Sequence, residues 1–327
     1  MFCVTNFLMA KIKDISTYLP QKVLSNEELA TRLSNWTPEK IFEKTGIKFR
    51  HIAEEDETTS DMAISAANRL LSKSNFDKEK IDMLFLITQT QDQCLPSSSC
   101  RIHKELGLSK NCGTFDINQG CSGYIYGLSV AKGLINSGDV NNVLMLTADT
   151  YTKLIDPEDS SVVTLFGDGA TATLIVPEEG KTESIGPCFF GTDGSKGDFL
   201  RCDFLGLKKK VEEQKYLLMN GPGILNFTLS KLPEELNDYL NKYKFRMHEF
   251  DLVVFHQANK FILKNLYKKI GIEDKGVISL ENTGNTVSSS IPMVLEDIIL
   301  KNSKTKRKIL LGGFGVGLSW AFTSVVI

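Results

Sequence analysis

The sequence predicts a duplicated α/β fold, in which each half builds a sheet that contains parallel strands. Two continuous apolar runs, residues 81–88 and 143–148, are bounded by polar sequence, which is typical of parallel strands covered on both faces. A weak internal repeat is the second observation, because Asp82 and Asp251 each precede a buried strand and a polar turn that contains glutamine. Such halves place loops at the carboxyl ends of their strands, so we expect these loops to meet between the halves.

The first half alternates helical and strand-like patterns. Ser25 and Glu28 form a capping-box signature that begins a short helix. The Gly-Asp-Gly sequence near residue 168 suggests a tight turn between two short strands. The elements expected in this half are strand 11–20, helix 26–33, helix 59–71, strand 81–88, helix 97–106, strand 114–117, strand 143–148 and two short strands within 164–176.

The second half repeats this order. Residues 180–213 are the least regular part, and we interpret Lys208–Lys210 as a solvated loop. Helical patterns resume over 222–244, and the strand 252–255 leads directly into His256. The sequence ILLGGFG near the carboxyl end matches VLMLTAD of the first half. We therefore expect two halves, residues 1–176 and 177–327.

Composition excludes several classes of function. The 327-residue chain has a net charge of -2, which gives no electrostatic basis for nucleic-acid binding. No run approaches the roughly 18 apolar residues of a membrane span, and residues 1–10 do not resemble a signal peptide. The seven cysteines are irregularly spaced and form neither a disulfide framework nor a zinc motif. We expect a cytoplasmic protein without a bound metal.

Cys121 is the first candidate catalytic residue. It lies in a turn between a short apolar strand and a helical pattern, flanked by Gly120 and Gly123, which allow close approach of backbone and substrate. A thiol at a helix N-terminus meets unpaired N–H groups and the positive end of the helix dipole, so we expect a lowered pKa. The alternative is a small buried cysteine that packs between strand and helix.

His256 and Asn285 are candidate partners of this cysteine. His256 follows a buried strand, where α/β proteins build their sites, and Asn285 lies in a polar turn, Asn282-Thr-Gly-Asn-Thr. A structural histidine and a helix-capping turn are the alternatives. Cysteine, histidine and asparagine in this order also suit a papain-like hydrolase. The papain-type signature is absent, however, and buried parallel strands do not fit that fold.

Separated motifs resemble those of a known family. They are GCSGYIYGL at 120–128, FGDGATATL at 166–174, FHQANKFIL at 255–263, NTGNTVSSSIP at 282–292 and GGFGVGLSW at 312–320. In order and separation they are similar to the motifs of the β-ketoacyl-acyl-carrier-protein synthase III family, within the thiolase-like condensing enzymes, over essentially the whole chain from Met9. The resemblance implies a duplicated thiolase-like fold with five layers, αβαβα, and a homodimer.

The resemblance also implies roles for the candidate residues. Cys121 would take an acyl group as a thioester. His256 and Asn285 would donate hydrogen bonds to the enolate oxygen formed when malonyl-acyl carrier protein loses CO2, a step that needs neutral, preorganised donors. The backbone N–H groups of Cys121 and Val316 would hold the acyl carbonyl oxygen. No cofactor is implied beyond the phosphopantetheine of coenzyme A or acyl carrier protein that bears the substrates.

Several positions depart from the family pattern. Lys40 and Ser160 occupy the positions of an adenine-stacking Trp and Arg, and Lys44 replaces an arginine that contacts phosphate, with loss of its bidentate geometry. This favours a carrier-bound donor over coenzyme A. Leu95 replaces the aromatic residue that closes the acyl pocket, and Val316 replaces a glycine. Basic residues that suit docking of an acidic carrier protein are Lys44, Lys260, Lys264, Lys268 and Lys269.

Two other functions remain open from the residues. An acyltransferase could use the same acyl-cysteine but deliver the acyl group to an amine or hydroxyl in a specialised pathway. A carrier-binding paralogue without activity is the third hypothesis. The sequence leaves open the acyl chain, its carrier, and whether the pathway is general fatty-acid initiation or a specialised one.

Overall fold

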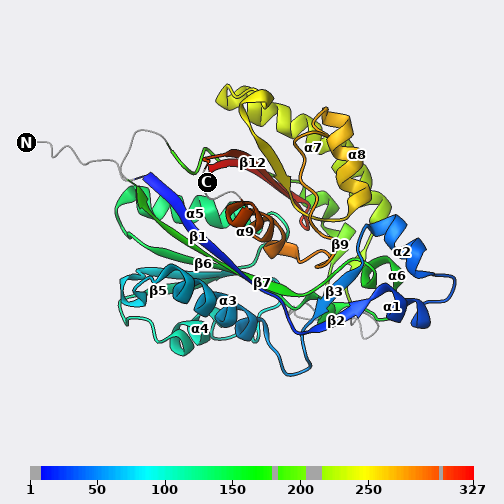
Figure 1. Cartoon of the computed structure of the whole chain (residues 1–327), viewed down its shortest axis with the longest axis horizontal. Helices are drawn as coiled ribbons and strands as arrows, with labels where there is room; N and C mark the ends of the chain where they lie inside the picture. Colours follow the sequence, from blue (N-terminus) through cyan, green and yellow to red (C-terminus); the bar gives the residue numbers. More distant parts are fainter. Residues whose placement is uncertain (1–8, 179–182, 204–215, 302–304) are drawn as a thin grey trace, which may run out of the picture.

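Five layers of helices and strands make up the computed structural model, which describes residues 9–178, 183–203, 216–301 and 305–327 (Figure 1). Helices α3 (Thr59–Ser74) and α4 (Ser98–Leu106) cover the outer face of a five-stranded sheet. Helices α5 (Gly123–Ser137) and α9 (Ser290–Lys301) separate this sheet from a second, four-stranded sheet. The predicted αβαβα thiolase-like fold is therefore confirmed. Cys3 and the Lys208–Lys210 run lie outside the described residues.

The first sheet has the strand order β1-β7-β6-β4-β5. Strands β4, β5 and β6 are parallel, whereas β7 runs antiparallel to both β6 and β1. The bounds of its strands are β1 (Met9–Tyr18), β4 (Met83–Ile87), β5 (Gly113–Ile117), β6 (Val143–Asp149) and β7 (Gly169–Glu178).

The second sheet repeats this arrangement in the order β11-β12-β13-β8. Strands β11 and β12 are parallel, and β13 runs antiparallel to β12 and β8. A parallel bridge between Val253 and Gly276 takes the place that β5 has in the first sheet. The duplication expected from the repeat is thus present in the sheets. The bounds of these strands are β8 (Phe189–Thr192), β11 (Leu252–Phe255), β12 (Lys308–Gly315) and β13 (Ser319–Val326).

Helices α7 (Gly221–Tyr243) and α8 (Lys260–Ile270) form the outer layer of the second half (Figure 1). The Ser25 side chain caps the first helix by accepting the Glu28 N–H, as predicted. The remaining elements are α1 (Asn26–Arg32), α2 (Pro38–Thr45), α6 (Ser160–Val163), β2 (Lys22–Ser25), β3 (Phe49–Ile52), β9 (Leu200–Arg201) and β10 (Leu218–Met219).

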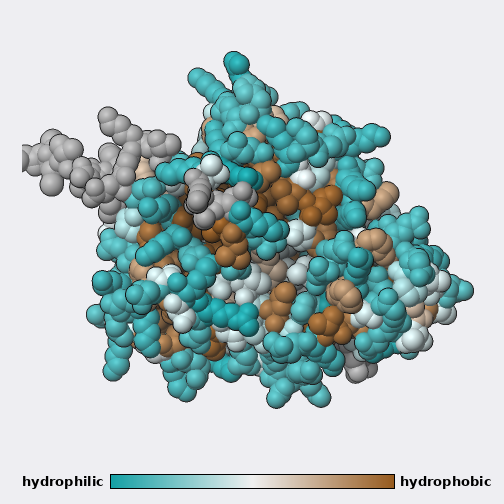
Figure 2. Space-filling view, in the orientation of Figure 1, coloured by the Kyte–Doolittle hydropathy of each residue, from teal (hydrophilic) through white to brown (hydrophobic). Residues whose placement is uncertain are grey.

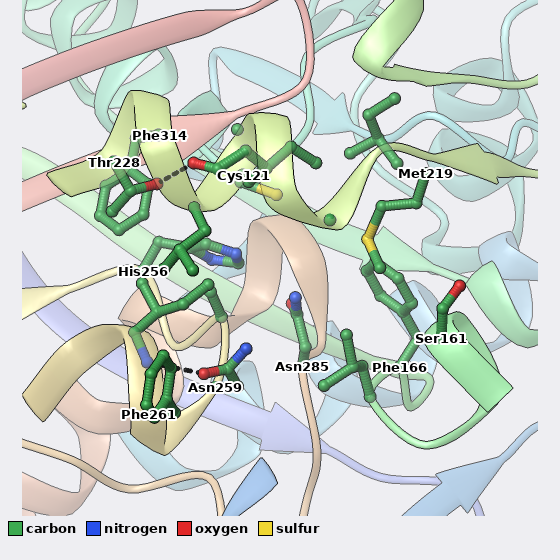
Figure 3. A pocket seen from close by; sticks show the side chains of 18 residues that line it. Cys121, Ser161, Phe166, Met219, Thr228, His256, Asn259, Phe261, Asn285 and Phe314 are labelled. Carbon is green, nitrogen blue, oxygen red and sulfur yellow. Dashed lines mark hydrogen bonds between the residues drawn. The ribbon is translucent and has the colours of Figure 1, made fainter. Parts of the chain in front are cut away.

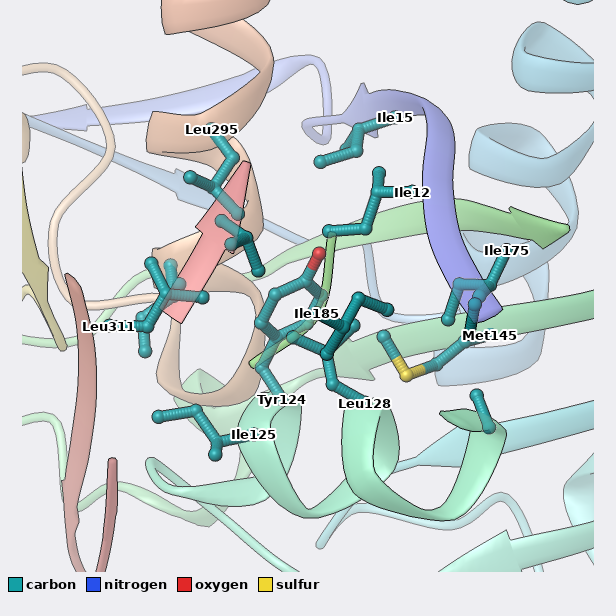
Figure 4. Close-up of a cluster of buried hydrophobic side chains, with 14 of the residues drawn as sticks. Ile12, Ile15, Tyr124, Ile125, Leu128, Met145, Ile175, Ile185, Leu295 and Leu311 are labelled. Carbon is teal, nitrogen blue, oxygen red and sulfur yellow. The ribbon is translucent and has the colours of Figure 1, made fainter. Parts of the chain in front are cut away.

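The largest hydrophobic cluster fills the space between the two sheets (Figure 4). Tyr124 and Leu128 of α5 meet Ile12 of β1, Leu295 of α9 and Leu311 of β12 there. Two further clusters lie beneath the outer helical layers. Polar side chains cover most of the face seen in Figure 2, and apolar ones show mainly in its middle. The central cluster therefore joins the halves, since both contribute to it.

Two expectations about local structure were wrong. Residues 164–176 do not form two strands around a turn, because the Asp168 carboxylate accepts backbone N–H bonds from Ala53 (2.9 Å) and Thr152 (3.0 Å) and so fixes this segment as a loop. Only β7 follows it. The irregular stretch 180–213 contains β8, which completes the second sheet and whose apolar pattern is too short to predict.

Direct backbone contact joins β12 to the turn that carries Cys121. A Cβ atom on Gly313 would lie 2.6 Å from Ser122 Cα and 2.9 Å from the Cys121 carbonyl oxygen. A Cβ atom on Gly315 would lie 2.9 Å from the Cys121 sulfur. Glycine at these positions lets the second half approach the turn, so the fold itself fixes Cys121 against β12.

A Gly313→Ala substitution should destabilise the protein by about 1–3 kcal/mol, because two backbones would have to separate. Thermal unfolding followed by circular dichroism measures this as a lower midpoint. Gly133→Ala is the matched control, since no atom lies within 4 Å of a Cβ there and alanine favours the helix by about 0.5–1 kcal/mol. Equal midpoints for the two variants would contradict the close contact.

Candidate active site

One pocket of about 250 Å³ brings Cys121, His256 and Asn285 together (Figure 3). The three residues are only 5%, 1% and 5% exposed. Cys121 follows β5 and His256 follows β11, so both stand at the carboxyl ends of parallel strands, as expected. In Figure 3, the His256 ring and the Asn285 side chain point toward the space beneath the Cys121 sulfur. Their catalytic roles remain a prediction.

Burial dominates the chemistry of the Cys121 thiol. It raises the pKa of Cys121 to about 12, and the charge of Asp149 acts in the same direction. Hydrogen bonds from the backbone N–H groups of Val316 and of Cys121 itself oppose this rise in pKa. The expectation of a lowered pKa was therefore wrong, because burial outweighs the position before α5. The same two N–H groups are the predicted oxyanion donors, and both face the sulfur.

Alkylation of Cys121 by iodoacetamide should accelerate roughly tenfold per pH unit from about pH 6 to about pH 10, because only the thiolate reacts and its fraction grows up to the raised pKa. Peptide-resolved mass spectrometry would separate Cys121 from the exposed Cys94 and Cys100. A rate that levels off below about pH 8 would contradict the raised pKa.

His256 is a neutral imidazole at physiological pH. Burial lowers the pKa of His256 to about 3, although a hydrogen bond to the Val287 backbone opposes this. Its Nδ1 lies 2.7 Å from the Ser290 hydroxyl oxygen, and its backbone N–H donates to the Gly312 carbonyl (2.8 Å). The Ser290 hydroxyl can donate to Nδ1, which leaves Nε2 protonated, or to the Val287 carbonyl at 3.0 Å. Ser290 thus allows a tautomer that donates from Nε2.

Asn285 is held so that its amide nitrogen remains a donor. Its side-chain oxygen accepts the Val287 N–H (3.0 Å), while its backbone pairs with Leu165 (2.9 Å) and Gly167 (3.1 Å). Val287 has a φ of 52°, which is strained for a β-branched residue and costs about 1–3 kcal/mol. The fold thus maintains an unfavourable backbone conformation beside Asn285.

Two buried charged residues near the site were not predicted from the sequence. Asp149 accepts the Gln89 N–H (2.8 Å) and the Ser288 hydroxyl (2.6 Å), and burial raises its pKa to about 7. Arg50 donates to the Thr164 carbonyl (3.0 Å) and supports the loop that pairs with Asn285. Asp149 is the last residue of a buried apolar run, and a carboxylate in that position is a signal that could have identified it from the sequence. The sequence around Arg50 contains no comparable signal.

The other predicted residues lie outside this pocket. Leu95 is 86% exposed and does not line this pocket. Lys44 and Lys40 lie over the Trp36 ring, at 4.9 and 5.1 Å from its centroid. Ser160, the other half of the altered stacking pair, begins α6.

The predicted docking lysines differ in exposure. Lys264, Lys268 and Lys269 are exposed on α8. The stem of Lys260 is half-buried, because it packs against Gly46 and lies over the Phe42 ring. Lys264, Lys268 and Lys269 are therefore the members of the predicted set on α8 that are best placed to meet a partner.

Within the described ranges, no group of three acidic, histidine or cysteine side chains could hold a metal ion. None of the helices in these ranges combines the length and the apolar character needed to cross a membrane.

Comparisons with known proteins agree with the motifs. Residues 115–194 match the family described as 3-oxoacyl-(acyl-carrier-protein) synthase III, and residues 240–327 match its C-terminal part. The chain is 37% identical to the β-ketoacyl-(acyl-carrier-protein) synthase III of Clostridium perfringens over 320 residues, which are 95% of this chain and 97% of the relative. 3-Oxoacyl and β-ketoacyl are two names for the same group.

Solved structures give the same result. A 3-oxoacyl-(acyl-carrier-protein) synthase III crystal structure superimposes with a TM-score of 0.91 at 40% identity and covers 97% of this chain and 99% of the other. The priming β-ketosynthase of the R1128 polyketide pathway has a TM-score of 0.90 at 30% identity, covering 100% and 98%. The resemblance inferred from the motifs is confirmed, and a papain-like hydrolase does not fit this fold.

Proposed function

Because the chain belongs to the 3-oxoacyl-(acyl-carrier-protein) synthase III family, it is an acyl-transferring condensing enzyme of the kind that serves fatty-acid synthesis, and we propose that Cys121, His256 and Asn285 carry its chemistry. The observation that supports these roles is the shared pocket of a thiol and two neutral donors. The family relationship does not favour the alternative in which the acyl group passes to an amine or hydroxyl.

In the proposed loading step, the Cys121 sulfur attacks the carbonyl carbon of an acyl thioester. A carbon–sulfur bond to Cys121 forms, the bond to the donor's sulfur breaks, and the thiol proton ends on the departing phosphopantetheine thiol. The N–H groups of Cys121 and Val316 stabilise the oxyanion of the tetrahedral intermediate. Since the resting thiol is protonated, this step moves a proton as well as the acyl group.

In the proposed condensation step, malonyl-acyl carrier protein loses CO2, and the electron pair of the broken bond forms an enolate. His256 Nε2 and the Asn285 amide donate hydrogen bonds to the enolate oxygen. The enolate carbon then attacks the acyl carbonyl on Cys121, the bond from that carbonyl carbon to the Cys121 sulfur breaks, and the thiolate takes up a proton from solvent. A neutral His256 can fill this role, because an imidazole that is protonated at Nε2 donates this hydrogen bond without carrying a charge.

Replacement of Asn285 by alanine should leave acyl loading intact and slow condensation by about 100- to 1000-fold, because one enolate donor is lost. Intact-protein mass spectrometry would report loading, and CO2 release from malonyl carrier would report condensation. Cys121→Ala is the control that should abolish loading. Unchanged CO2 release in Asn285→Ala would remove the proposed role of Asn285, and loading that survives in Cys121→Ala would exclude Cys121 as the nucleophile.

Both substrates, in this proposal, arrive on phosphopantetheine, and the protein needs no resident cofactor. Lys40 and Ser160 stand in place of an adenine-stacking Trp and Arg, and Lys44 stands in place of an arginine that contacts phosphate, which favours a carrier-bound acyl donor over coenzyme A. Acyl carrier protein would dock on the basic side chains of α8 beside the pocket, since Phe261 and Ile262 of the same helix line that pocket.

A charge reversal, Lys264→Glu, should lower kcat/KM for malonyl carrier severalfold and leave the reaction of a small malonyl pantetheine thioester unchanged, because only the carrier contacts α8. Steady-state rates with the two substrates measure the difference. Lys110→Glu, at an exposed position after α4, is the matched control. If Lys264→Glu and Lys110→Glu lower kcat/KM equally, α8 is not the docking surface.

A homodimer is also part of this proposal. Strand β5 has a partner only on its β4 side within the described chain, and an open, apolar strand edge invites pairing. The highly exposed Leu95 would be covered by a second copy. Light scattering coupled to size exclusion should give twice the 36.4 kDa chain mass.

We place the protein in a reducing cytoplasm, because the six cysteines of the described part are free thiols.

A further inference from the structure

A second pocket, of about 220 Å³, borders the Cys121 turn on the side of Val316. Its residues Tyr151, Leu154 and Leu217 belong to the same buried cluster as Cys121. A Cβ atom on Gly120 would lie 2.4 Å from Gln89 Oε1 and 2.7 Å from a Val316 methyl group, so both of these lining residues touch the turn. The pocket is therefore adjacent to the Cys121 turn, and it shares only Leu200 with the pocket that His256 and Asn285 line.

The lining of this pocket is polar, in contrast to that of the first. Among the lining residues of the first pocket, apolar side chains predominate. Five of the ten residues of the second carry a polar amide, hydroxyl or guanidinium group: Gln89, Gln91, Asn118, Tyr151 and Arg201. A plain alkyl chain in this space would remove water from those groups without replacing its hydrogen bonds.

Tyr151 and Gln89, two residues of this lining, form a hydrogen-bonded pair. The Tyr151 hydroxyl donates to Gln89 Oε1 at 2.9 Å, and the Gln89 backbone N–H donates to Asp149 at 2.8 Å. Within the described residues, the Gln89 amide nitrogen makes no hydrogen bond, so its two N–H donors remain available. The Tyr151 oxygen also keeps a lone pair. The pair can thus donate to a ligand oxygen and accept from a ligand hydroxyl.

We propose that the acyl group held by Cys121 is a short one that carries an oxygen substituent, a hydroxyl or a ketone, which hydrogen-bonds to the Gln89–Tyr151 pair. This inference rests on the proposed function, because it specifies the acyl group of that reaction. The volume of the pocket, about 220 Å³, limits the size of the acyl group that it can hold.

Matched acyl thioesters test this proposal. Each pair differs only in a hydroxyl in place of a methyl group: 3-hydroxybutyryl against 3-methylbutyryl, and 4-hydroxypentanoyl against 4-methylpentanoyl, each offered on coenzyme A and on acyl carrier protein. Intact-protein mass spectrometry measures the rate of Cys121 acylation. We expect the hydroxylated member of at least one pair to load roughly five- to tenfold faster, the effect of a neutral hydrogen bond.

Two variants locate the origin of that preference. Tyr151→Phe and Gln89→Met remove the hydrogen-bonding groups with little change in volume and should each reduce the preference toward unity, with loading of the methyl-bearing thioester retained. Tyr126→Phe is the matched control, since Tyr126 lies against Phe190 and borders neither pocket. The Tyr126→Phe variant should prefer the hydroxylated thioester by the same factor as the wild-type protein.

Equal or faster loading of the methyl-bearing member in both pairs would overturn the proposal, as would a preference that survives in both Tyr151→Phe and Gln89→Met. Addition of malonyl carrier to each loaded protein separates this failure from that of the proposed function. If malonyl carrier releases CO2 although the protein loads the hydroxylated thioester no faster than its methyl-bearing counterpart, only the acyl assignment is wrong. If no thioester loads Cys121, both proposals fail.

Discussion

The contact between β12 and the Cys121 turn is the constraint on which the site depends. The turn belongs to the first sheet, β12 to the second, and Gly313 and Gly315 allow their backbones to touch. A hydrogen-bonded set of Gln119, Ser122 and Ser319, with all three distances at 2.9 Å, reinforces this joint. Because Val316 follows β12 directly, the same contact that joins the halves directs its N–H group at the sulfur.

The site performs its proposed chemistry with neutral groups in a buried space. Burial keeps Cys121 protonated and His256 neutral, since it raises one pKa and lowers the other. Charge then appears only transiently, first on the acyl oxygen and later on the enolate oxygen, and each position has donors prepared for it. The charge of Asp149 raises the pKa of Cys121 and so disfavours its thiolate. Because the thiolate is also the leaving group of the acyl-cysteine, the same charge favours a cysteine that stays acylated between the two steps.

The sequence was sufficient to predict the buried parallel strands and the convergence of Cys121, His256 and Asn285 in one place, because such strands and the loops that follow them have local signatures. It was not sufficient where contacts join distant segments. Asp168 fixes a loop through Ala53, and Arg50 reaches Thr164 across 114 positions, neither of which leaves a local pattern. The pKa of Cys121 was mispredicted for the same reason, since the helix position is visible in the sequence and the depth of burial is not.

The most direct test of this account is a single turnover of the wild-type protein. Cys121 is loaded with an acyl thioester, excess donor is removed, and malonyl carrier is added. The account predicts one CO2 released per acyl group lost from Cys121, together with a carrier-bound β-ketoacyl product. Loss of the acyl group to an amine, an alcohol or water, without CO2 and without that product, would contradict it.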